Sequence, residues 1–264
     1  MGHYQHPFVL HGIDAVRETA KFIMRYLGRS DRMDLIEKDD HSYTTQVDQQ
    51  AEVLLIESIL QRFPKHIIIG EETGTHTPNQ PDQIKWIIDP IDGTMNFIHG
   101  LPYFCISIAI AYQDEIEHAI IYDPMRNELW TASKGQGLQL DQKRIRMRTP
   151  KSPKLLMSCN LPCRQTEPLN HYTQQLKQLQ PELGSIRHLG SVGLELAYTA
   201  SNRLQAVQHY GLKPWDKDAG LLMIKEAGGD ILHIPAQKDR PSGFIAGQPD
   251  VVNRIKARLS IENA

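Results

Sequence analysis

The sequence has little of what marks a membrane-spanning, secreted or zinc-binding protein. No apolar run approaches the roughly 20 residues that a membrane-spanning helix needs, and Met1–Leu10 has no apolar stretch typical of a signal peptide. Cysteine is scarce: Cys105, Cys159 and Cys163 are an odd number, and the C-x₃-C spacing of the last two lacks the second pair of ligands that a zinc site requires. We therefore expect free thiols and a reducing, cytoplasmic location, with no membrane association.

A large excess of charge of one sign is absent as well. The chain carries 29 basic and 31 acidic residues, a net charge of −2, which speaks against nucleic acid as a partner. One basic cluster remains, formed by Lys143, Arg144, Arg146 and Arg148. It fits either a basic patch or a solvated edge strand protected by positive charge, and we favour the edge strand.

Internal repeats and low-complexity tracts are also missing, and what is present is the pattern of an α+β protein. Residues 104–112 alternate between large and small side chains, typical of a strand covered on both faces. Residues 117–122 and 128–132 are expected to continue it as an antiparallel meander, which argues against a regular doubly wound parallel sheet. Further strands are expected at 155–158, 185–188 and 207–210, and a loop with a short hairpin at 29–46. Helices are expected at 9–27, 49–63, 169–179, 194–203 and 218–227, and Asp48 can cap the second of them.

The 264 residues fit one domain, 1–264, built from two lobes that share a site. The segment 149–154 contains two prolines and is the best boundary between them. We expect residues 1–149 to form one lobe and residues 150–264 the other.

The most informative stretch is Trp86–Phe97, which reads W-I-I-D-P-I-D-G-T-M-N-F. A short apolar strand ends at Asp89, and Asp92, Gly93 and Thr94 follow at once. Asp-Pro and Asp-Gly are also common turn dipeptides. Two carboxylates at the end of a strand nevertheless suit Mg²⁺, which takes oxygen ligands at about 2.1 Å, and a helix beginning at Gly93 would direct backbone N–H groups toward an anion.

A second strand, 67–69, ends in the acidic pair Glu71 and Glu72. If the two strands are neighbours, four carboxylates crowd one place, and bound divalent cations would relieve their repulsion. Two such ions can clamp a phosphate ester and activate water. Asp216 follows Pro214-Trp215 at the start of a helix and is either a helix cap or a further ligand.

These motifs together resemble the inositol monophosphatase family, within the Mg²⁺-dependent, lithium-sensitive phosphatases. The resemblance runs from the first helix to Gly247, and the matching motifs are Gly70-Glu71-Glu72, Asp89–Thr94 with Asn96-Phe97, and Pro214–Asp216 with Glu226–Gly229. It implies a layered αβαβα sandwich like that of fructose-1,6-bisphosphatase-type sugar phosphatases. It also implies a cytoplasmic homodimer that takes two Mg²⁺ ions, with a third, weaker site near Glu72.

The resemblance also implies roles for individual residues. Glu71, Asp89 and the Ile91 carbonyl would hold the first ion, and Asp89, Asp92 and Asp216 the second. Thr94 and Asp48 would orient the attacking water beside Glu71, and the N–H groups of Gly93 and Thr94 would bind phosphate. Lys38 matches a lysine of the family's mobile metal-site loop.

The substrate side departs from the family pattern. Gly190, Ser191, Val192 and Gly193 match a turn of small residues that contacts sugar-alcohol hydroxyls, where the family usually has alanine at the last two positions. His209 replaces the glutamate that binds inositol hydroxyls, and Asp216 would border the same pocket. An imidazole offers a different set of donors and acceptors, so His209 is either a selectivity residue or a tolerated change in a permissive polyol pocket.

The implied activity is hydrolysis of myo-inositol-1-phosphate and related polyol phosphates to inositol and inorganic phosphate. The alternatives are the same chemistry on fructose 1,6-bisphosphate, histidinol phosphate, NADP or a nucleotide 3′-phosphate. A third hypothesis is a partner role with RNA polymerase, as in some bacterial members of the family.

Overall fold

The structure is a computed structural model that describes residues 6–29, 33–37, 43–149, 152–160, 166–237 and 241–259, with the backbone alone for 166–171. Lys38 and Cys163 lie outside these residues. The helices are α1 (Pro7–Ile23), α2 (Gln46–Arg62), α3 (Thr94–Ile98), α4 (Thr166–Leu179), α5 (Val192–Ala200), α6 (Pro214–Glu226) and α7 (Pro249–Leu259).

Fifteen strands are described: β1 (Leu35–Glu37), β2 (Tyr43–Thr45), β3 (Ile67–Gly70), β4 (Gly74–His76), β5 (Ile84–Asp92), β6 (Cys105–Tyr112), β7 (Glu115–Asp123), β8 (Glu128–Ser133), β9 (Gly137–Leu140), β10 (Lys143–Ile145), β11 (Leu155–Cys159), β12 (Leu183–Arg187), β13 (Ala206–Tyr210), β14 (Asp230–Ile234) and β15 (Gly243–Gly247). The first two form the expected short hairpin.

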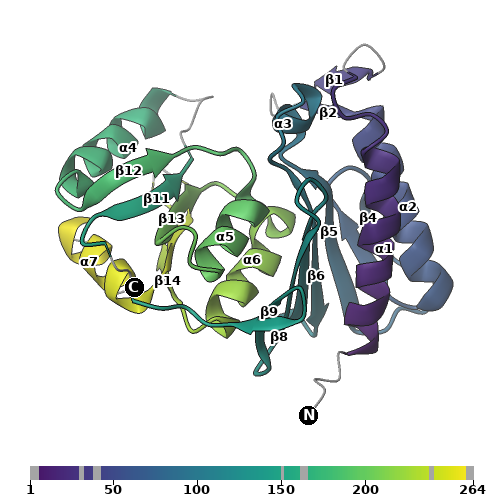
Figure 1. Ribbon diagram of the computed structural model, residues 1–264. Coiled ribbons are helices and arrows are strands. Elements are labelled where there is room, and N and C mark those ends of the chain that lie inside the picture. The colour runs from purple at the N-terminus through teal and green to yellow at the C-terminus, as the bar shows by residue number, and fades with distance from the viewer. Residues whose placement is uncertain are drawn as a thin grey trace.

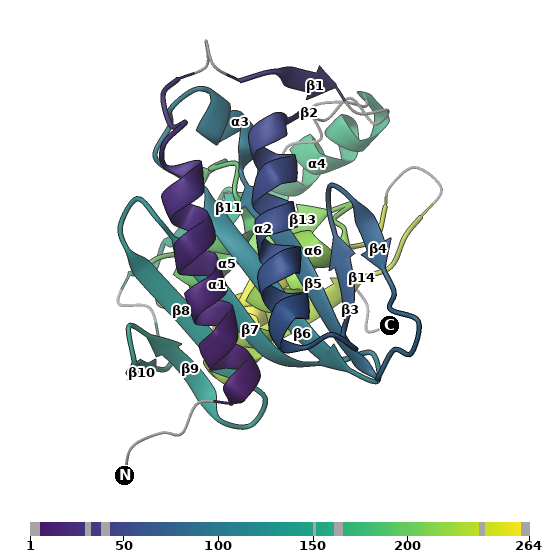
Figure 2. The same cartoon turned by 90° about the vertical axis from the view of Figure 1, so that its right-hand side faces the viewer.

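The remaining strands form two sheets in a layered α+β arrangement. The eight-stranded sheet has the order β10-β9-β8-β7-β6-β5-β3-β4, and the five-stranded sheet β12-β11-β13-β15-β14. Helices α1 and α2 run across the outer face of the first sheet (Figure 2). Helices α5 and α6 lie between the sheets, and α4 and α7 lie on the far side of the second one (Figure 1). The expected αβαβα sandwich is therefore confirmed.

The central strand β6 shows why the layers form. Ile106 and Ile108, with Phe104 just before the strand, pack into the core beneath α1 and α2. Cys105 and Ala109 pack into the core beneath α5 and α6. Large side chains of this segment thus fill the core beneath α1 and α2, and small ones face α5 and α6. The prediction that both faces of this strand are covered is confirmed.

The parallel pairing of β3 with β5 positions the acidic turns. Gly70 is in register with Ile88, and the Glu71 N–H donates to the Ile88 carbonyl at 3.2 Å. The carboxyl ends of the two strands therefore meet at the same edge of the sheet, as the sequence predicted.

Two predicted boundaries at this edge were wrong. Strand β5 continues through Pro90 to Asp92, because one extra residue forms a bulge between the pairs Asp89–Ser107 and Asp92–Cys105. Helix α2 begins at Gln46, and its cap is Thr45 rather than Asp48. Asp48 is the third helical residue and completes a capping box, so its side chain turns back toward the helix start.

Elsewhere, the predicted edge strand is confirmed for Lys143 and Arg144, because β10 is the last strand of its sheet, whereas Arg146 and Arg148 follow after it ends. The change of sheet falls between Ile145 and Leu155, and separate lobes stay a prediction. Helix α1 ends at Ile23, before the expected Leu27. Strands β14 and β15 and helix α7 were not predicted.

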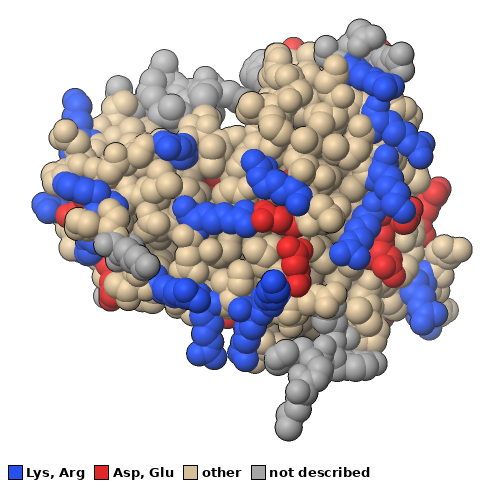
Figure 3. All heavy atoms as spheres, in the orientation of Figure 1, with Lys and Arg blue, Asp and Glu red and all other residues tan. Residues whose placement is uncertain are grey.

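The spread of charged side chains and the state of the described cysteines agree with the expectations from the composition. Figure 3 shows Lys and Arg side chains spread over one face, with Asp and Glu among them. Cys105 and Cys159 are buried, free thiols. Within the described ranges, each helix is too short or too polar to cross a bilayer.

Candidate active site

Three carboxylates from separate elements converge at the edge where β3 and β5 end. One carboxylate oxygen each from Glu71, Asp89 and Asp216 lies within 4.8 Å of the others. Glu71 follows β3, Asp89 lies in β5 at 2 % exposure, and Asp216 comes from the first turn of α6. The first sheet and a helix of the second half of the chain therefore both contribute to one acidic cluster.

The electrostatics of this cluster favour a cation. Burial raises the pKa of Asp89 well above its usual range, and Glu71, Asp92 and Asp216 raise it further. Burial also raises the pKa of Asp216 to about 6, although the Lys213 N–H donates to its Oδ2 at 2.7 Å. Three carboxylate oxygens at this separation, one buried and two half-buried, fit a hard divalent ion such as Mg²⁺. Asp216 is thus a helix-capping residue and a member of the cluster at once.

Asp92 lies close to this cluster but bonds to the start of α5. Its Oδ2 accepts hydrogen bonds from Ser191 Oγ and the Gly193 N–H, both at 2.6 Å, and Oδ1 accepts the Val192 N–H at 3.1 Å. Burial raises the pKa of Asp92 to about 6 in spite of these donors. Its role as a ligand of a second ion stays a prediction, and such a ligand would share its oxygens with the helix.

The predicted metal carbonyl of Ile91 lies on the strand between the two aspartates. Its oxygen lies 3.1 Å from Thr94 Oγ1, as a second acceptor within reach of that hydroxyl, while the Ile91 N–H donates to Asp89 Oδ1 at 2.9 Å. The bulge in β5 thus folds Asp89, Ile91 and Thr94 together. Coordination by Ile91 stays a prediction.

A residue that the sequence reasoning missed, Glu52, holds the turn after β3. Its carboxylate accepts the Glu72 N–H at 2.9 Å and the Thr73 N–H at 2.7 Å. A side chain at Gly70 would collide with it, since an added Cβ would lie 2.4 Å from the carboxyl carbon. One signal pointed to Glu52: it lies four residues after Asp48, on the same face of α2 as Leu55. A carboxylate on a buried helix face needs partners of its own.

Asp48 and Thr94, the predicted water-orienting pair, are in contact. Thr94 Oγ1 lies 3.1 Å from Asp48 Oδ1, while Asp48 Oδ2 accepts the hydroxyl of Thr45 at 2.5 Å and its N–H at 3.0 Å. Burial raises the pKa of Asp48 to about 6, the Thr45 hydrogen bond opposes this, and Glu72 adds to it. Glu72 therefore lies on the Asp48 side of the site, outside the three-carboxylate group.

The predicted phosphate-binding residues begin the short helix α3. Gly93 has φ of 102°, and a Cβ there would lie 3.1 Å from the Tyr103 carbonyl oxygen and 3.2 Å from that of Gly190. Only glycine fits this conformation and this space. Asn96 Nδ2 in turn donates to the Leu189 carbonyl at 2.7 Å. The start of α3 therefore packs directly against the turn at Gly190.

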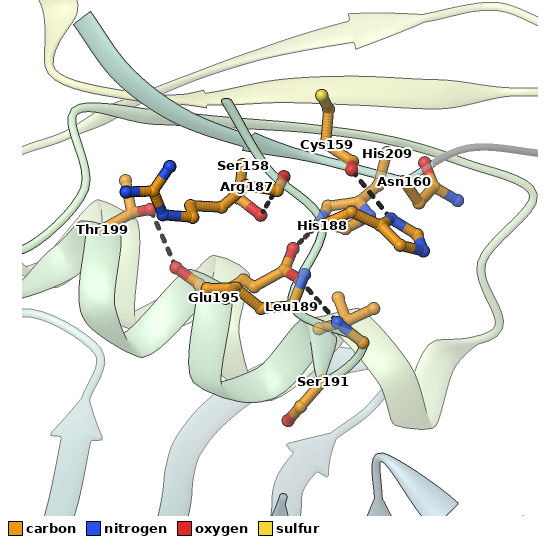
Figure 4. A network of polar contacts seen from close by, with 12 residues as sticks. Ser158, Cys159, Asn160, Arg187, His188, Leu189, Ser191, Glu195, Thr199 and His209 are labelled. Atoms are coloured by element: carbon orange, nitrogen blue, oxygen red, sulfur yellow. Dashed lines mark hydrogen bonds and ion pairs between the residues drawn. The ribbon is translucent and has the colours of Figure 1, made fainter. Parts of the chain in front are cut away.

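His209 differs from the prediction of an imidazole that faces substrate. Its side chain is 1 % exposed, and Nε2 lies 2.8 Å from Oε2 of Glu195 in α5 (Figure 4). The ring also borders a mostly apolar cavity of about 270 Å³ between α6 and the second sheet, beside Lys217 and His233. A direct contact between His209 and substrate stays a prediction, and Glu195 is a partner that the sequence did not indicate.

Comparison with known proteins agrees with this geometry. The sequence pattern of the inositol monophosphatase family matches residues 5–259. The chain is 35 % identical to the Nus factor SuhB of Escherichia coli (strain K12) over 260 residues, 97 % of each chain. A structure of the extragenic suppressor protein suhB from Bartonella henselae superposes with a TM-score of 0.90 at 28 % identity, covering 97 % of this chain and 99 % of that one. An IMPase from Thermotoga maritima superposes with a TM-score of 0.84 at 27 % identity, covering 97 % of both. The chain therefore belongs to the inositol monophosphatase family.

Proposed function

We propose that this protein is a Mg²⁺-dependent phosphomonoesterase that hydrolyses myo-inositol-1-phosphate and related polyol phosphates. The observation that carries the proposal is the convergence of Glu71, Asp89 and Asp216, whose oxygens lie within 4.8 Å of one another. Membership of the inositol monophosphatase family supports the reaction class. The choice of polyol phosphate rests on the family name and on the small-residue turn at Gly190.

The carboxylates divide into two ligand sets. Glu71, Asp89 and the Ile91 carbonyl would hold one ion, and Asp89, Asp92 and Asp216 the other, with Glu72 beside a third, weaker site. Bound Mg²⁺ would supply charge for the phosphoryl oxygens and acidity for a coordinated water. The buried carboxylates would be ionised in that state, because the cations offset the repulsion that raises their pKa values.

Asp48 and Thr94 would orient the attacking water. When Thr94 donates its hydroxyl proton to Asp48 at 3.1 Å, its remaining lone pairs accept a hydrogen bond from water. A threonine hydroxyl is too weak a base to take the proton itself, so its contribution is direction. The Gly93 and Thr94 N–H groups would bind phosphate oxygens, since the first amides of a helix have no acceptor inside it.

The experiment that tests this function is a substrate panel at saturating Mg²⁺. The values of kcat/KM for myo-inositol-1-phosphate, fructose 1,6-bisphosphate, histidinol phosphate, NADP and a nucleotide 3′-phosphate are compared on the same preparation. We expect the highest value for myo-inositol-1-phosphate or another polyol phosphate, and no release of phosphate in EDTA. A clear preference for NADP or the nucleotide would contradict the substrate assignment and retain the chemistry.

The relatives named Nus factor SuhB favour a second candidate function, binding to the transcription machinery. Purified RNA polymerase is passed over the immobilised protein and over its Asp89→Asn variant. Equal retention by both would support a partner role that is independent of catalysis, and no retention would exclude it.

Sedimentation of the free protein tests the expected homodimer, which has twice the 30.1 kDa mass of one chain.

A further inference from the structure

We propose that Glu195, held by His209, is a positioning residue that fixes the Gly190–Ser191 turn and through it the metal-side carboxylate of Asp92. The inference rests on the proposed function, because it takes Asp92 as a ligand of the second ion. It assigns the pair to the metal end of the site rather than to recognition of the polyol. Figure 4 shows Glu195 with His209, Leu189 and Ser191.

First, Glu195 binds the turn that precedes its own helix. Its Oε1 accepts the Leu189 N–H at 3.0 Å and the Gly190 N–H at 3.2 Å. The cap residue Ser191 makes no side-chain bond to the helix, because its hydroxyl is directed to Asp92. Glu195 therefore reaches back from inside the helix and holds the two residues that precede the cap, while Asp92 accepts the first amides of the helix.

Second, residues at the end of this turn donate hydrogen bonds to Asp92. Ser191 Oγ, the Val192 N–H and the Gly193 N–H all donate to the Asp92 carboxylate, at 2.6, 3.1 and 2.6 Å. The other side of the turn is fixed to α3, where Asn96 donates to the Leu189 carbonyl. A displacement of the turn therefore moves the donors that orient Asp92.

The third step is the need of Glu195 for a partner. Its side chain is 2 % exposed, and a buried carboxylate is stable only when it is paired and hydrogen-bonded. His209 lies on β13, where it is in register with Phe244 of β15, so the sheet fixes its position. The 2.8 Å contact between His209 and Glu195 thus ties α5 to the second sheet. Burial opposes ionisation of Glu195, but His209, Ser158 and Leu189 outweigh it and lower the pKa.

Positioning and substrate selection predict different kinetics. A residue that orients a metal ligand changes the affinity for the ion, typically by about 10- to 100-fold, and does so alike for every substrate. A residue that contacts the polyol changes the ratio of kcat/KM between substrates. The pair acts through Asp92, so we expect the first pattern.

The test measures metal binding directly, by calorimetric titration of Mn²⁺ into the substrate-free protein, and Mg²⁺ activation of phosphate release. The variants are Glu195→Ala, Glu195→Gln and His209→Gln, and the matched control is Ser201→Ala, whose hydroxyl bonds only to carbonyls within α5. Glu195→Ala is expected to weaken the second Mn²⁺ site at least about tenfold. Glu195→Gln is expected to recover part of the loss, because the amide oxygen still accepts from Leu189 and Gly190. The ratios of kcat/KM between substrates should stay constant in all variants. The control should match the wild type in Mn²⁺ affinity and in Mg²⁺ activation.

Mn²⁺ affinities within about twofold of the wild type for both Glu195→Ala and His209→Gln, with native near-ultraviolet circular dichroism, would overturn the inference. So would a change in substrate ratios without a change in metal affinity. If the variants weaken Mn²⁺ binding but no phosphate ester is hydrolysed by the wild type, the positioning role stands and the proposed function fails. If the wild type hydrolyses the ester normally and the variants bind Mn²⁺ as it does, the proposed function stands and the positioning role fails.

Discussion

The backbone N–H of Gly193 donates to Oδ2 of Asp92 at 2.6 Å, so the first turn of α5 holds an acidic residue of the other sheet. The same glycine faces Cys105, and an added Cβ would lie 2.9 Å from its sulfur and 3.0 Å from Asp92 Oδ2. The family usually has alanine at this position. In this chain the Cys105 side chain occupies the space that the alanine methyl group would need.

This relationship predicts that Gly193→Ala displaces either Cys105 or Asp92. We expect a loss of stability of about 1–3 kcal/mol from overpacking and about a tenfold rise in the Mg²⁺ concentration for half-maximal activity. The double variant Gly193→Ala/Cys105→Ala removes the sulfur and should recover most of both losses. Thermal unfolding and Mg²⁺ titration check this, and a single variant that matches the wild type would refute it.

We expect the ionised Asp216 carboxylate to destabilise the metal-free protein. Its pKa is raised from 3.8 to about 6, so the native state binds more protons than the unfolded chain between about pH 4 and 6. Stability contributed by this group is therefore present at acid pH and is lost as the pH rises through about 6. In EDTA at pH 7.5, Asp216→Asn should raise the unfolding free energy by about 1–3 kcal/mol.

The control for Asp216→Asn is the same comparison at pH 5 and in Mg²⁺. The gain should shrink at pH 5, where the wild-type carboxyl is largely protonated. Added Mg²⁺ should raise the Tm of the wild type more than that of the variant, because an ion that binds only the native state stabilises it. A variant that is less stable in EDTA at pH 7.5 would show that Asp216 is a structural cap and no strained ligand.

The contact between Thr94 and Asp48 predicts that removing the Thr94 hydroxyl lowers kcat without lowering the affinity for the metal ion. Thr94→Val should lower kcat by about 10²-fold or more with little change in Mn²⁺ affinity, whereas Thr94→Ser should keep most of the rate. Because an ionised carboxylate is the stronger acceptor and the pKa of Asp48 in the metal-free protein is about 6, kcat should fall as the pH falls toward that value. A flat kcat profile from pH 5 to 8 would argue against Asp48 as the acceptor.

His209→Glu, which restores the family's residue, should destabilise this protein. The new carboxylate would stand against Glu195, whose Oε2 lies 2.8 Å from the present imidazole. Breaking a buried pair costs about 3–5 kcal/mol, so we expect a marked fall in Tm. Glu195→Gln/His209→Glu should recover it, since one of the two charges is removed. An unchanged Tm in the single variant would mean that Glu195 and His209 are not coupled.

The sequence predicted those parts of the site whose structure is decided by the local pattern of residues. Two short apolar strands followed by Glu71 and Asp89 could be placed side by side, because a parallel pair brings such ends together. The cap at Thr45 was missed, since Asp48 is an equally good capping residue and the choice depends on Asp48 facing Thr94. The pair Glu195–His209 could not be foreseen, because its members lie on a helix and a strand whose contact depends on tertiary packing. Strands β14 and β15 were not predicted because they are short and their residues do not alternate clearly between apolar and polar.

The metal site is tested most directly by phosphate release from myo-inositol-1-phosphate, measured for the wild type, Asp89→Asn and the exposed-residue control Asp14→Asn. We expect Mg²⁺-dependent hydrolysis by the wild type and the control. In Asp89→Asn we expect kcat to fall about a thousandfold, which corresponds to roughly 4 kcal/mol of transition-state stabilisation. Hydrolysis that persists in Asp89→Asn, or that proceeds in EDTA, would contradict the metal site on which the whole assignment depends.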